Sequence, residues 1–166
     1  MTIETAPAET TVTHGTFTLE RTYTFDRPTV FGAWATRNDK NQWFGEGDDF
    51  LAKTERFELD FRVGGRELLE GRLPSGRHFV YDSTYRDIVD DRRIIVEYDV
   101  LVDDRRVSVS LMTVEFLDID GGTKVLLTEQ GAFLDGLDTN DDRTDGASHM
   151  LDQLGRFLDP GGAKVN

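Results

Sequence analysis

The sequence contains no cysteine among its 166 residues. This absence excludes disulfide frameworks, thiolate catalysis and zinc–thiolate sites, and it fits a reducing cytoplasm. There is also no apolar run near the roughly 18 residues that a membrane-spanning helix needs. A chain of this length is expected to form one domain that buries roughly 70% of the surface exposed by the unfolded chain, so neither metals nor disulfides are needed for stability.

Basic residues are much fewer than acidic residues. Nineteen Lys and Arg residues face 32 Asp and Glu residues, which gives a formal net charge of −13. Such a surface repels phosphate backbones and anionic lipids, so we expect no nucleic-acid partner and no membrane partner. Residues Met1–Thr13 lack the basic start and the apolar stretch of a signal peptide. The expected location is therefore the cytoplasm.

Strong catalytic and metal-binding signatures are missing as well. The three histidines, His14, His78 and His149, have no i, i+4 spacing and no cysteine partner, so no metal site is predicted. No serine lies in a Gly-x-Ser-x-Gly elbow. The pairs Gly64–Gly65 and Gly121–Gly122 do not precede helices, so they indicate turns and not phosphate cradles. We expect no cofactor, and the sequence leaves open whether the protein is an enzyme.

The N-terminal third of the chain combines an arm, a strand and two short helices. Residues 1–15 are rich in Thr, Ala, Glu and Pro, which predicts a disordered arm. From Phe17 to Phe25 apolar and polar residues alternate, as in a half-buried strand. Asp26 can cap a short helix over Pro28–Thr36. Asn38 can cap a second short helix that runs to Trp43.

Six further strands are predicted after these helices. They follow one another at short intervals with tight turns between them, which favours one antiparallel meander. Their expected ranges are Phe57–Val63, Arg66–Gly71, Phe79–Tyr85, Ile94–Tyr98, Val107–Phe116 and Thr123–Phe133.

A long amphipathic helix is predicted near the C-terminus. Its apolar stripe runs from Ala147 to Leu158 at helical spacing. Asp141 or Asp142 can cap its start, and Pro160 with the two following glycines ends it. A sheet with one apolar face and an amphipathic helix can bury each other only by packing together.

The predicted fold class is therefore α+β. A seven-stranded, strongly twisted antiparallel sheet wraps around the long C-terminal helix, and the two short helices after the first strand close one end. We expect a single domain over residues 16–159, preceded by the arm and followed by a flexible tail over residues 160–166.

Several local motifs occur in an order that resembles the START-like superfamily, also called SRPBCC, Bet v I-like or helix-grip. Within it the chain resembles the stand-alone bacterial form of the family named for the activator of the heat-shock-protein-90 ATPase. The matching segments are Arg21–Pro28 with Trp34, Trp43–Gly45, Asp60–Gly65, Asp90–Ile94, Gly122–Thr123, Thr128–Gly131 and Gly146–Leu158. The resemblance implies the helix-grip fold. It also implies binding or transformation of hydrophobic molecules, or, as in one branch, stimulation of a chaperone.

Arg21 and Glu129 form the most informative polar pair. Both fall on the apolar side of their predicted strands, and the first and last strands are neighbours in the helix-grip topology, so the two side chains could meet. A carboxyl group facing an apolar cavity can act as an acid or base, which makes Glu129 the catalytic candidate. The alternatives are a buried structural ion pair, or a register shifted by one residue that turns both side chains outward.

A cavity between sheet and helix is suggested by tyrosines on the inward side of the strands, by adaptable methionines and by small residues that open the last helix. Plain core packing is the alternative for the aromatic residues. The residues expected to line the cavity are Arg21, Trp34, Trp43, Phe44, Phe61, Phe79, Tyr81, Tyr85, Met112, Glu129, Phe133, Gly146 and Met150.

Two functions are compatible with these patterns. In the first, the protein binds a small hydrophobic or aromatic molecule in the cavity and acts on it, if at all, by cofactor-free acid–base chemistry. In the second, it is a protein-interaction module of the chaperone-activator kind, with a chaperone as partner for its outer surface. A homodimer is left open. A void lined by tyrosine and methionine favours the first function, and a fully packed interior favours the second.

Overall fold

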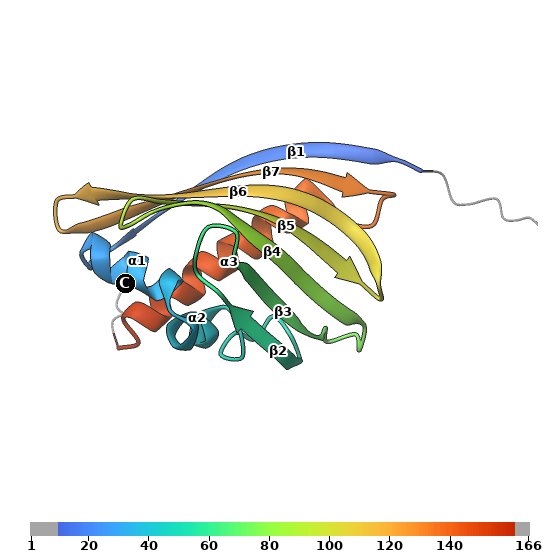
Figure 1. Ribbon diagram of the computed structural model, residues 1–166, viewed down its shortest axis with the longest axis horizontal. Coiled ribbons are helices and arrows are strands. Elements are labelled where there is room, and N and C mark those ends of the chain that lie inside the picture. The colour runs from blue at the N-terminus through green and yellow to red at the C-terminus, as the bar shows by residue number, and fades with distance from the viewer. Residues whose placement is uncertain (1–9, 162–166) are drawn as a thin grey trace, which may run out of the picture.

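A computed structural model describes residues 10–161 as one seven-stranded antiparallel sheet with three helices (Figure 1). The strand order is β1-β7-β6-β5-β4-β3-β2, so each strand from β2 onward pairs with its neighbour in sequence and β1 pairs with β7. The elements are β1 (Val12–Tyr23), α1 (Arg27–Ala35), α2 (Arg37–Trp43), β2 (Lys53–Leu59), β3 (Arg66–Arg72), β4 (His78–Val89), β5 (Arg93–Val102), β6 (Arg105–Ile119), β7 (Gly122–Leu134) and α3 (Asn140–Leu158). The predicted helix-grip fold is confirmed.

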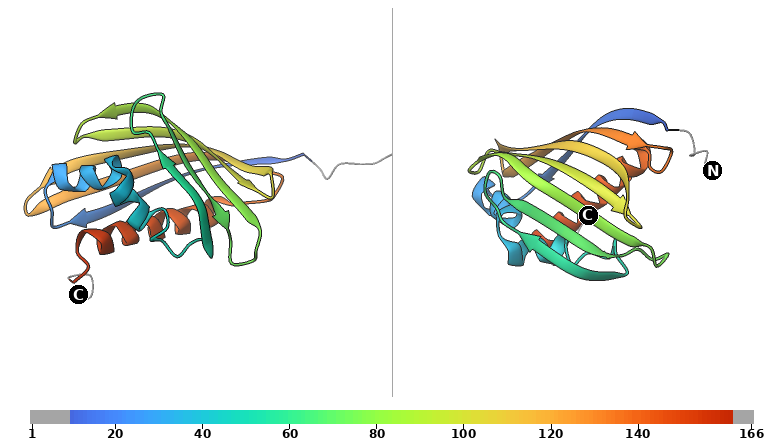
Figure 2. Two further views of the ribbon diagram at one scale, coloured as in Figure 1. Left: turned by 60° about the horizontal axis from the view of Figure 1, so that its bottom comes forward. Right: turned by 45° about the vertical axis from the view of Figure 1, so that its right-hand side comes forward.

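The sheet curls around α3, which runs along its concave face (Figures 1 and 2). The helices α1 and α2 pack against the C-terminal half of α3 and close that end of the sheet. On α3 the buried side chains are Ala147, Met150, Leu151 and Leu154, which follow the stripe predicted from helical spacing. Nowhere in residues 10–161 is there a helix both long and apolar enough to cross a membrane.

Strand β1 includes the last four residues of the predicted arm. It starts at Val12, which is paired with Leu134, and Gly15 lies opposite Gly131. Main-chain hydrogen bonds to β7 form this extension, and such bonds require no apolar side chains. The prediction of a disordered arm is therefore wrong for residues 12–15. Residues 1–9 of the arm and residues 162–166 of the tail lie outside the described residues.

The start of α1 follows its predicted cap, whereas the start of α2 does not. The Asp26 carboxylate accepts a hydrogen bond from the Thr29 main-chain N–H at 3.0 Å. Helix α2 starts directly after Thr36, and Asn38 lies inside it. The two helices share this single residue as C-cap and N-cap, so no room is left for a separate Asn38 cap.

The start of α3 is capped by Thr139 and not by Asp141 or Asp142. The Thr139 hydroxyl accepts a hydrogen bond from the Asp142 main-chain N–H at 3.1 Å. The two aspartates lie in the first turn, where a carboxylate interacts favourably with the helix dipole.

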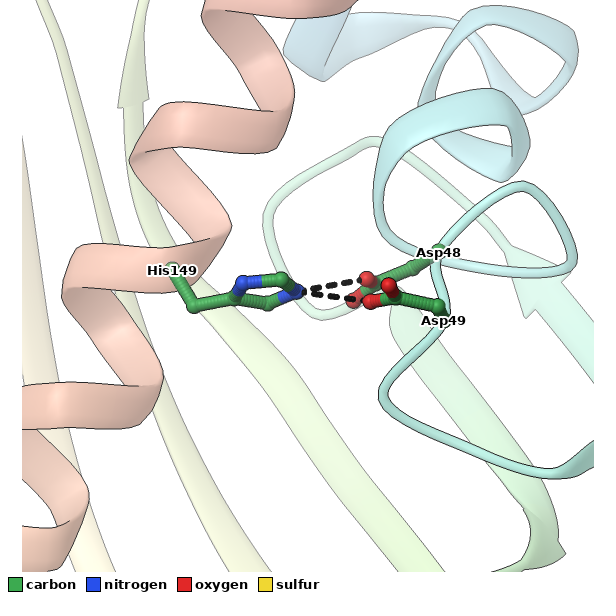
Figure 3. Close-up of side chains that lie close together, drawn as sticks. All are labelled: Asp48, Asp49 and His149. Atoms are coloured by element: carbon green, nitrogen blue, oxygen red, sulfur yellow. Dashed lines mark hydrogen bonds and ion pairs between the residues drawn. The ribbon is translucent and has the colours of Figure 1, made fainter.

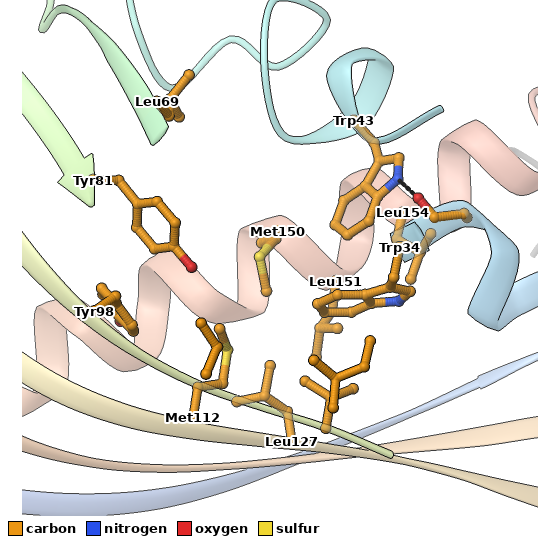
Figure 4. Close-up of a cluster of buried hydrophobic side chains, with 14 of the residues drawn as sticks. Trp34, Trp43, Leu69, Tyr81, Tyr98, Met112, Leu127, Met150, Leu151 and Leu154 are labelled. Carbon is orange, nitrogen blue, oxygen red and sulfur yellow. Dashed lines mark hydrogen bonds between the residues drawn. The ribbon is translucent and has the colours of Figure 1, made fainter. Parts of the chain in front are cut away.

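The closed end of the sheet is a packed aromatic core (Figure 4). Trp34 and Trp43 meet edge to face with ring centroids 4.9 Å apart. The Trp43 indole donates a hydrogen bond to the Ala33 carbonyl at 3.0 Å. Such aromatic pairs contribute roughly 0.5–1.5 kcal/mol beyond the burial of their area. This core leaves the other end of the concave face, beside the N-terminal half of α3, less completely filled.

Candidate ligand-binding cavity

A cavity of about 290 Å³ lies between the concave face of the sheet and the N-terminal half of α3. Its wall is largely apolar because alternate residues of each strand point to the same face. Representative wall residues are Leu69 from β3, Phe79 from β4, Val100 from β5, Met112 from β6 and Met150 from α3.

Seven of the thirteen residues expected at the cavity line it in the structure. They come from the loop after α2, from three strands and from α3, and Figure 4 shows three of them, Tyr81, Met112 and Met150, gathered on one side of the aromatic core. The seven are Phe44, Phe79, Tyr81, Met112, Glu129, Gly146 and Met150.

Four of the expected aromatic residues lie instead in the packed core at the closed end. Trp34 and Trp43 fill the space under α1 and α2 and are 2% and 1% exposed. Phe61 packs edge to face on Tyr85 with centroids 5.1 Å apart. All four point inward as expected, but the short helices dock against this part of the concave face and leave no void there.

Phe133 and Arg21 also lie away from the cavity. The Phe133 ring lies beneath the Arg143 guanidinium, whose central carbon is 5.5 Å from the ring centroid. Arg21 reaches along the outer side of α3, where its Nε is 3.0 Å from the Asp152 carboxylate and one Nη donates to the Ser148 hydroxyl at 2.6 Å.

The expected contact between Arg21 and Glu129 does not form. Strand β1 does lie beside β7, but Arg21 is opposite Val125 whereas Glu129 is opposite Phe17. Four residues along a strand correspond to about 13 Å. The residue pattern placed both side chains on the inward face, but only the register determines which residues are neighbours.

Glu129 instead belongs to a buried polar cluster at the inner wall of the cavity. The residue is 2% exposed. Its Oε2 accepts a hydrogen bond from the Tyr98 hydroxyl at 2.7 Å and lies 3.5 Å from an Nη of Arg143. That Nη also donates to the Tyr98 oxygen at 3.0 Å. The cluster therefore joins β7, β5 and α3 through three side chains.

The Arg143 guanidinium is held by further acceptors around it. It donates to the hydroxyls of Ser108 and Ser110 at 2.7 and 3.2 Å. Its second Nη also donates to the Asp138 carboxylate at 2.6 Å. Charge-assisted bonds of this kind are among the strongest hydrogen bonds in proteins, so the arginine is fixed in place by the protein itself.

Burial raises the pKa of the Glu129 carboxyl above its ordinary value, and the hydrogen bond from Tyr98 and the positive charge of Arg143 oppose this rise. Burial also raises the pKa of the Tyr98 phenol, and the charge of Glu129 adds to the effect. Tyr98 therefore remains a hydrogen-bond donor at neutral pH, and Glu129 keeps its proton to a higher pH than an exposed carboxyl group does.

The raised pKa predicts a measurable pH dependence of stability. The folded protein binds a proton at Glu129 more readily than the unfolded chain does. The resulting stabilisation is complete at acidic pH and is lost as the pH rises above the ordinary value of 4.5 through the raised folded pKa. We expect the unfolding free energy of the wild type to fall relative to that of Glu129→Gln over this range, as measured by urea unfolding. Parallel pH profiles for the two proteins would contradict this expectation.

A second polar group lies at the rim of the cavity, where the loop between α2 and β2 meets α3 (Figure 3). His149 Nε2 is 3.0 Å from the Asp48 carboxylate and 3.1 Å from that of Asp49. Asp48 is 8% exposed in its side chain and also accepts a bond from Gln153 at 3.3 Å. These contacts hold the loop against the helix.

Two side-chain groups in the described residues are close enough to share a cation. The first is Asp48, Asp49 and His149 at the cavity rim. The second is Glu55, Glu70 and His78 on strands β2–β4. Each has the donor atoms of a divalent-cation site, and in each the histidine already pairs with at least one of the carboxylates. The prediction of no metal site was based on sequence spacing alone, whereas the residues of these two groups come together only in the folded protein.

Sequence reasoning missed two residues of the buried cluster although a signal was present for both. Tyr98 has the same strand parity as the buried Ile94 and Val96. Arg143 lies four residues before Ala147 and seven before Met150, on the apolar stripe of α3. A charged residue at such a position indicates a buried partner. No comparable signal marked Asp48, which lies in a loop.

A sheet that grips a long C-terminal helix and leaves a cavity between them defines the SRPBCC, or helix-grip, class of proteins. The chain belongs to the family of activator of Hsp90 ATPase homolog 1-like proteins, which matches residues 24–159. The family and superfamily expected from the sequence motifs are thus confirmed.

Solved structures agree with this assignment. A protein from Rhizobium leguminosarum is 37% identical over 92% of this chain and 99% of its own length, with a TM-score of 0.86. A protein from Rhizobium loti is 37% identical over 89% and 99%, with a TM-score of 0.82. DynU16, a protein in the dynemicin biosynthetic locus, shares the fold alone, at 12% identity over 88% of this chain and 48% of its own, with a TM-score of 0.64. No curated protein matches the sequence.

Proposed function

We propose that this protein binds a small hydrophobic or aromatic molecule in the cavity between α3 and the sheet. The observation that supports this most is a void of about 290 Å³ with an apolar wall and a few convergent polar groups, those of Tyr81, Tyr98 and Glu129. Ligand sites have this composition. An efficiently packed core avoids it, because buried hydroxyls and carboxyls cost free energy.

The mouth of the cavity supports access from solvent. Phe50 and Leu137, which both line it, are 42% and 37% exposed. Gly146 on α3 also lines the cavity and is exposed, and a Cβ atom added there would meet no atom within 4 Å. Apolar side chains exposed around an opening are a common feature of binding sites for hydrophobic molecules.

An uncharged fluorescent probe, N-phenyl-1-naphthylamine, tests this proposal. We expect saturable binding to the native protein at one site. Gly146→Trp should weaken binding several-fold, because the ring occupies the mouth. Gly146→Ala is the matched control: it should leave binding unchanged and stabilise the protein by about 0.5–1 kcal/mol, since alanine is the better helix former.

Probe binding that appears only under mildly denaturing conditions would mean that the interior is closed. The proposal would then fail, and a role for the outer surface in binding a protein partner would be preferred. Native mass spectrometry of freshly purified protein, searched for a co-purifying small molecule, provides the complementary positive test.

Acid–base chemistry on a bound molecule would fall to Glu129. The carboxyl group lines the cavity, is 2% exposed and has a raised pKa because of burial. A buried carboxyl group with a raised pKa is better suited to act as a general acid or base than an exposed one. The hydrogen bond from Tyr98 would orient the carboxyl group during such a step.

A further inference from the structure

The charged groups that line the cavity are mostly acidic. Four carboxyl groups contribute to the wall and mouth, and they come from the loop after α2, from β7, from the loop that follows β7 and from the first turn of α3. Only two groups that can carry positive charge accompany them. The acidic residues are Asp48, Glu129, Asp138 and Asp142, and the basic ones are Arg143 and His149.

Neither basic group is free to receive an anionic ligand. Both terminal nitrogens of Arg143 already contact protein acceptors, among them the carboxyls of Glu129 and Asp138 at 3.5 and 2.6 Å. The Nε2 atom of His149 contacts Asp48 and Asp49 at 3.0 and 3.1 Å. An anionic ligand would therefore have to compete with protein carboxylates for the positive charge of either group.

One of the four carboxyl groups has no basic partner in the described part of the chain. Asp142 lies exposed in the first turn of α3, and within residues 10–161 its side chain forms no ion pair. The walls below it contain the rings of Phe79, Tyr81 and Tyr98. Aromatic faces attract cations through their quadrupole, so the wall and the mouth favour the same sign of ligand charge.

We infer, on the basis of the proposed function, that the cavity selects its ligand by charge. It accepts a hydrophobic or aromatic body that is uncharged or carries an amine, and it rejects a carboxylate, sulfonate or phosphate of the same shape. The apolar body lies against the wall, and the amine lies at the mouth near Asp142. The formal net charge of −13 acts in the same direction on approaching ligands.

Three naphthalene derivatives of matched size test this inference: 2-naphthylmethylamine, 2-naphthylmethanol and 2-naphthoate. Their dissociation constants can be measured by isothermal titration calorimetry at low and at physiological salt. We expect the amine and the alcohol to bind at least about tenfold more tightly than the acid, because juxtaposed like charges cost binding free energy. The preference of the amine over the acid should shrink as salt is added.

The outcomes separate the charge inference from the proposed function. Equal binding of all three compounds, or tighter binding of 2-naphthoate, overturns the charge inference and leaves the binding cavity in place. If none of the three compounds binds and N-phenyl-1-naphthylamine does not bind either, both the charge inference and the proposed function fail. Binding of the amine and alcohol without the acid supports both.

Two substitutions on α3 test which carboxyl group is responsible. Asp142→Asn should weaken the preference for the amine over the acid by about threefold or more, because it removes the carboxylate at the mouth. Asp145→Asn removes the same charge from the next turn at an exposed position that does not line the cavity. It should leave the preference unchanged. An equal effect of both variants would assign the selectivity to the overall charge of the chain and overturn the role of the mouth.

Discussion

Replacing Lys40 by methionine is expected to destabilise the protein by about 3–5 kcal/mol, the range typical of breaking a buried ion pair. Lys40 on α2 is 3% exposed, and its Nζ lies 2.8 Å from a carboxylate oxygen of Glu67 on β3, which is fully buried. The ammonium group also lies 5.0 Å from the ring centroids of Trp34 and Phe44. Methionine keeps most of the volume but leaves Glu67 as an uncompensated charge.

The Glu67 carboxyl group explains why this effect should be large. One of its oxygens receives hydrogen bonds from Lys40 and from the Tyr85 hydroxyl. The other is buried and, within the described part of the chain, has no hydrogen-bond partner. The group therefore depends on the lysine for compensation of its charge.

A double variant distinguishes the loss of the charge pair from a loss of packing. Lys40→Met combined with Glu67→Gln should recover part of the stability lost in the single variant, because no buried charge then remains. The control is Arg62→Met, which removes an exposed pair with Asp60 and should cost only about 0–1 kcal/mol. Urea unfolding measures all three. A loss in Lys40→Met as small as that of the control would show that the buried pair does not support the fold.

Leu154→Ala is expected to lower the unfolding free energy by about 2–5 kcal/mol. Leu154 is fully buried on α3, within the aliphatic and aromatic cluster beneath the sheet (Figure 4). The substitution removes apolar contacts and leaves a void that rigid neighbours such as Trp34 cannot fill. Thermal or urea unfolding gives the change directly.

The same substitution at Leu158 is the matched control. Leu158 is the last residue of α3 and only partly buried, so Leu158→Ala should cost clearly less than Leu154→Ala. Comparable losses at the two positions would contradict the packing of α3 against the concave face as its main source of stability.

Most of the sheet and the long helix could be predicted because apolar and polar residues alternate in the sequence with the period of a strand or of a helix. Tyr81 and Phe79 share a face through the period of two in β4, and Leu151 and Leu154 share one through the helical period in α3. The extension of β1 to Val12 could not be predicted in this way. It depends on main-chain bonds to β7, to which the identity of the side chains contributes little.

The cavity illustrates the limit of such reasoning. Sequence parity placed Tyr81 and Tyr85 on the same inward face, and both are buried there. Only the docking of α1 and α2 made the Tyr85 end a packed core, and left the Tyr81 end open as a cavity. Parity determines the face on which a side chain lies but not what covers that face.

The partners of the buried charged groups show the same division. By itself the sequence determined the α+β class, the order of the elements, the inward side of each strand and the inward position of Glu129. Only the tertiary structure determined that Glu129 meets Tyr98 and Arg143, and that Lys40 meets Glu67. The physical reason is that periodicity is a local property of the chain, whereas strand register and helix docking are set by the packing of the whole domain.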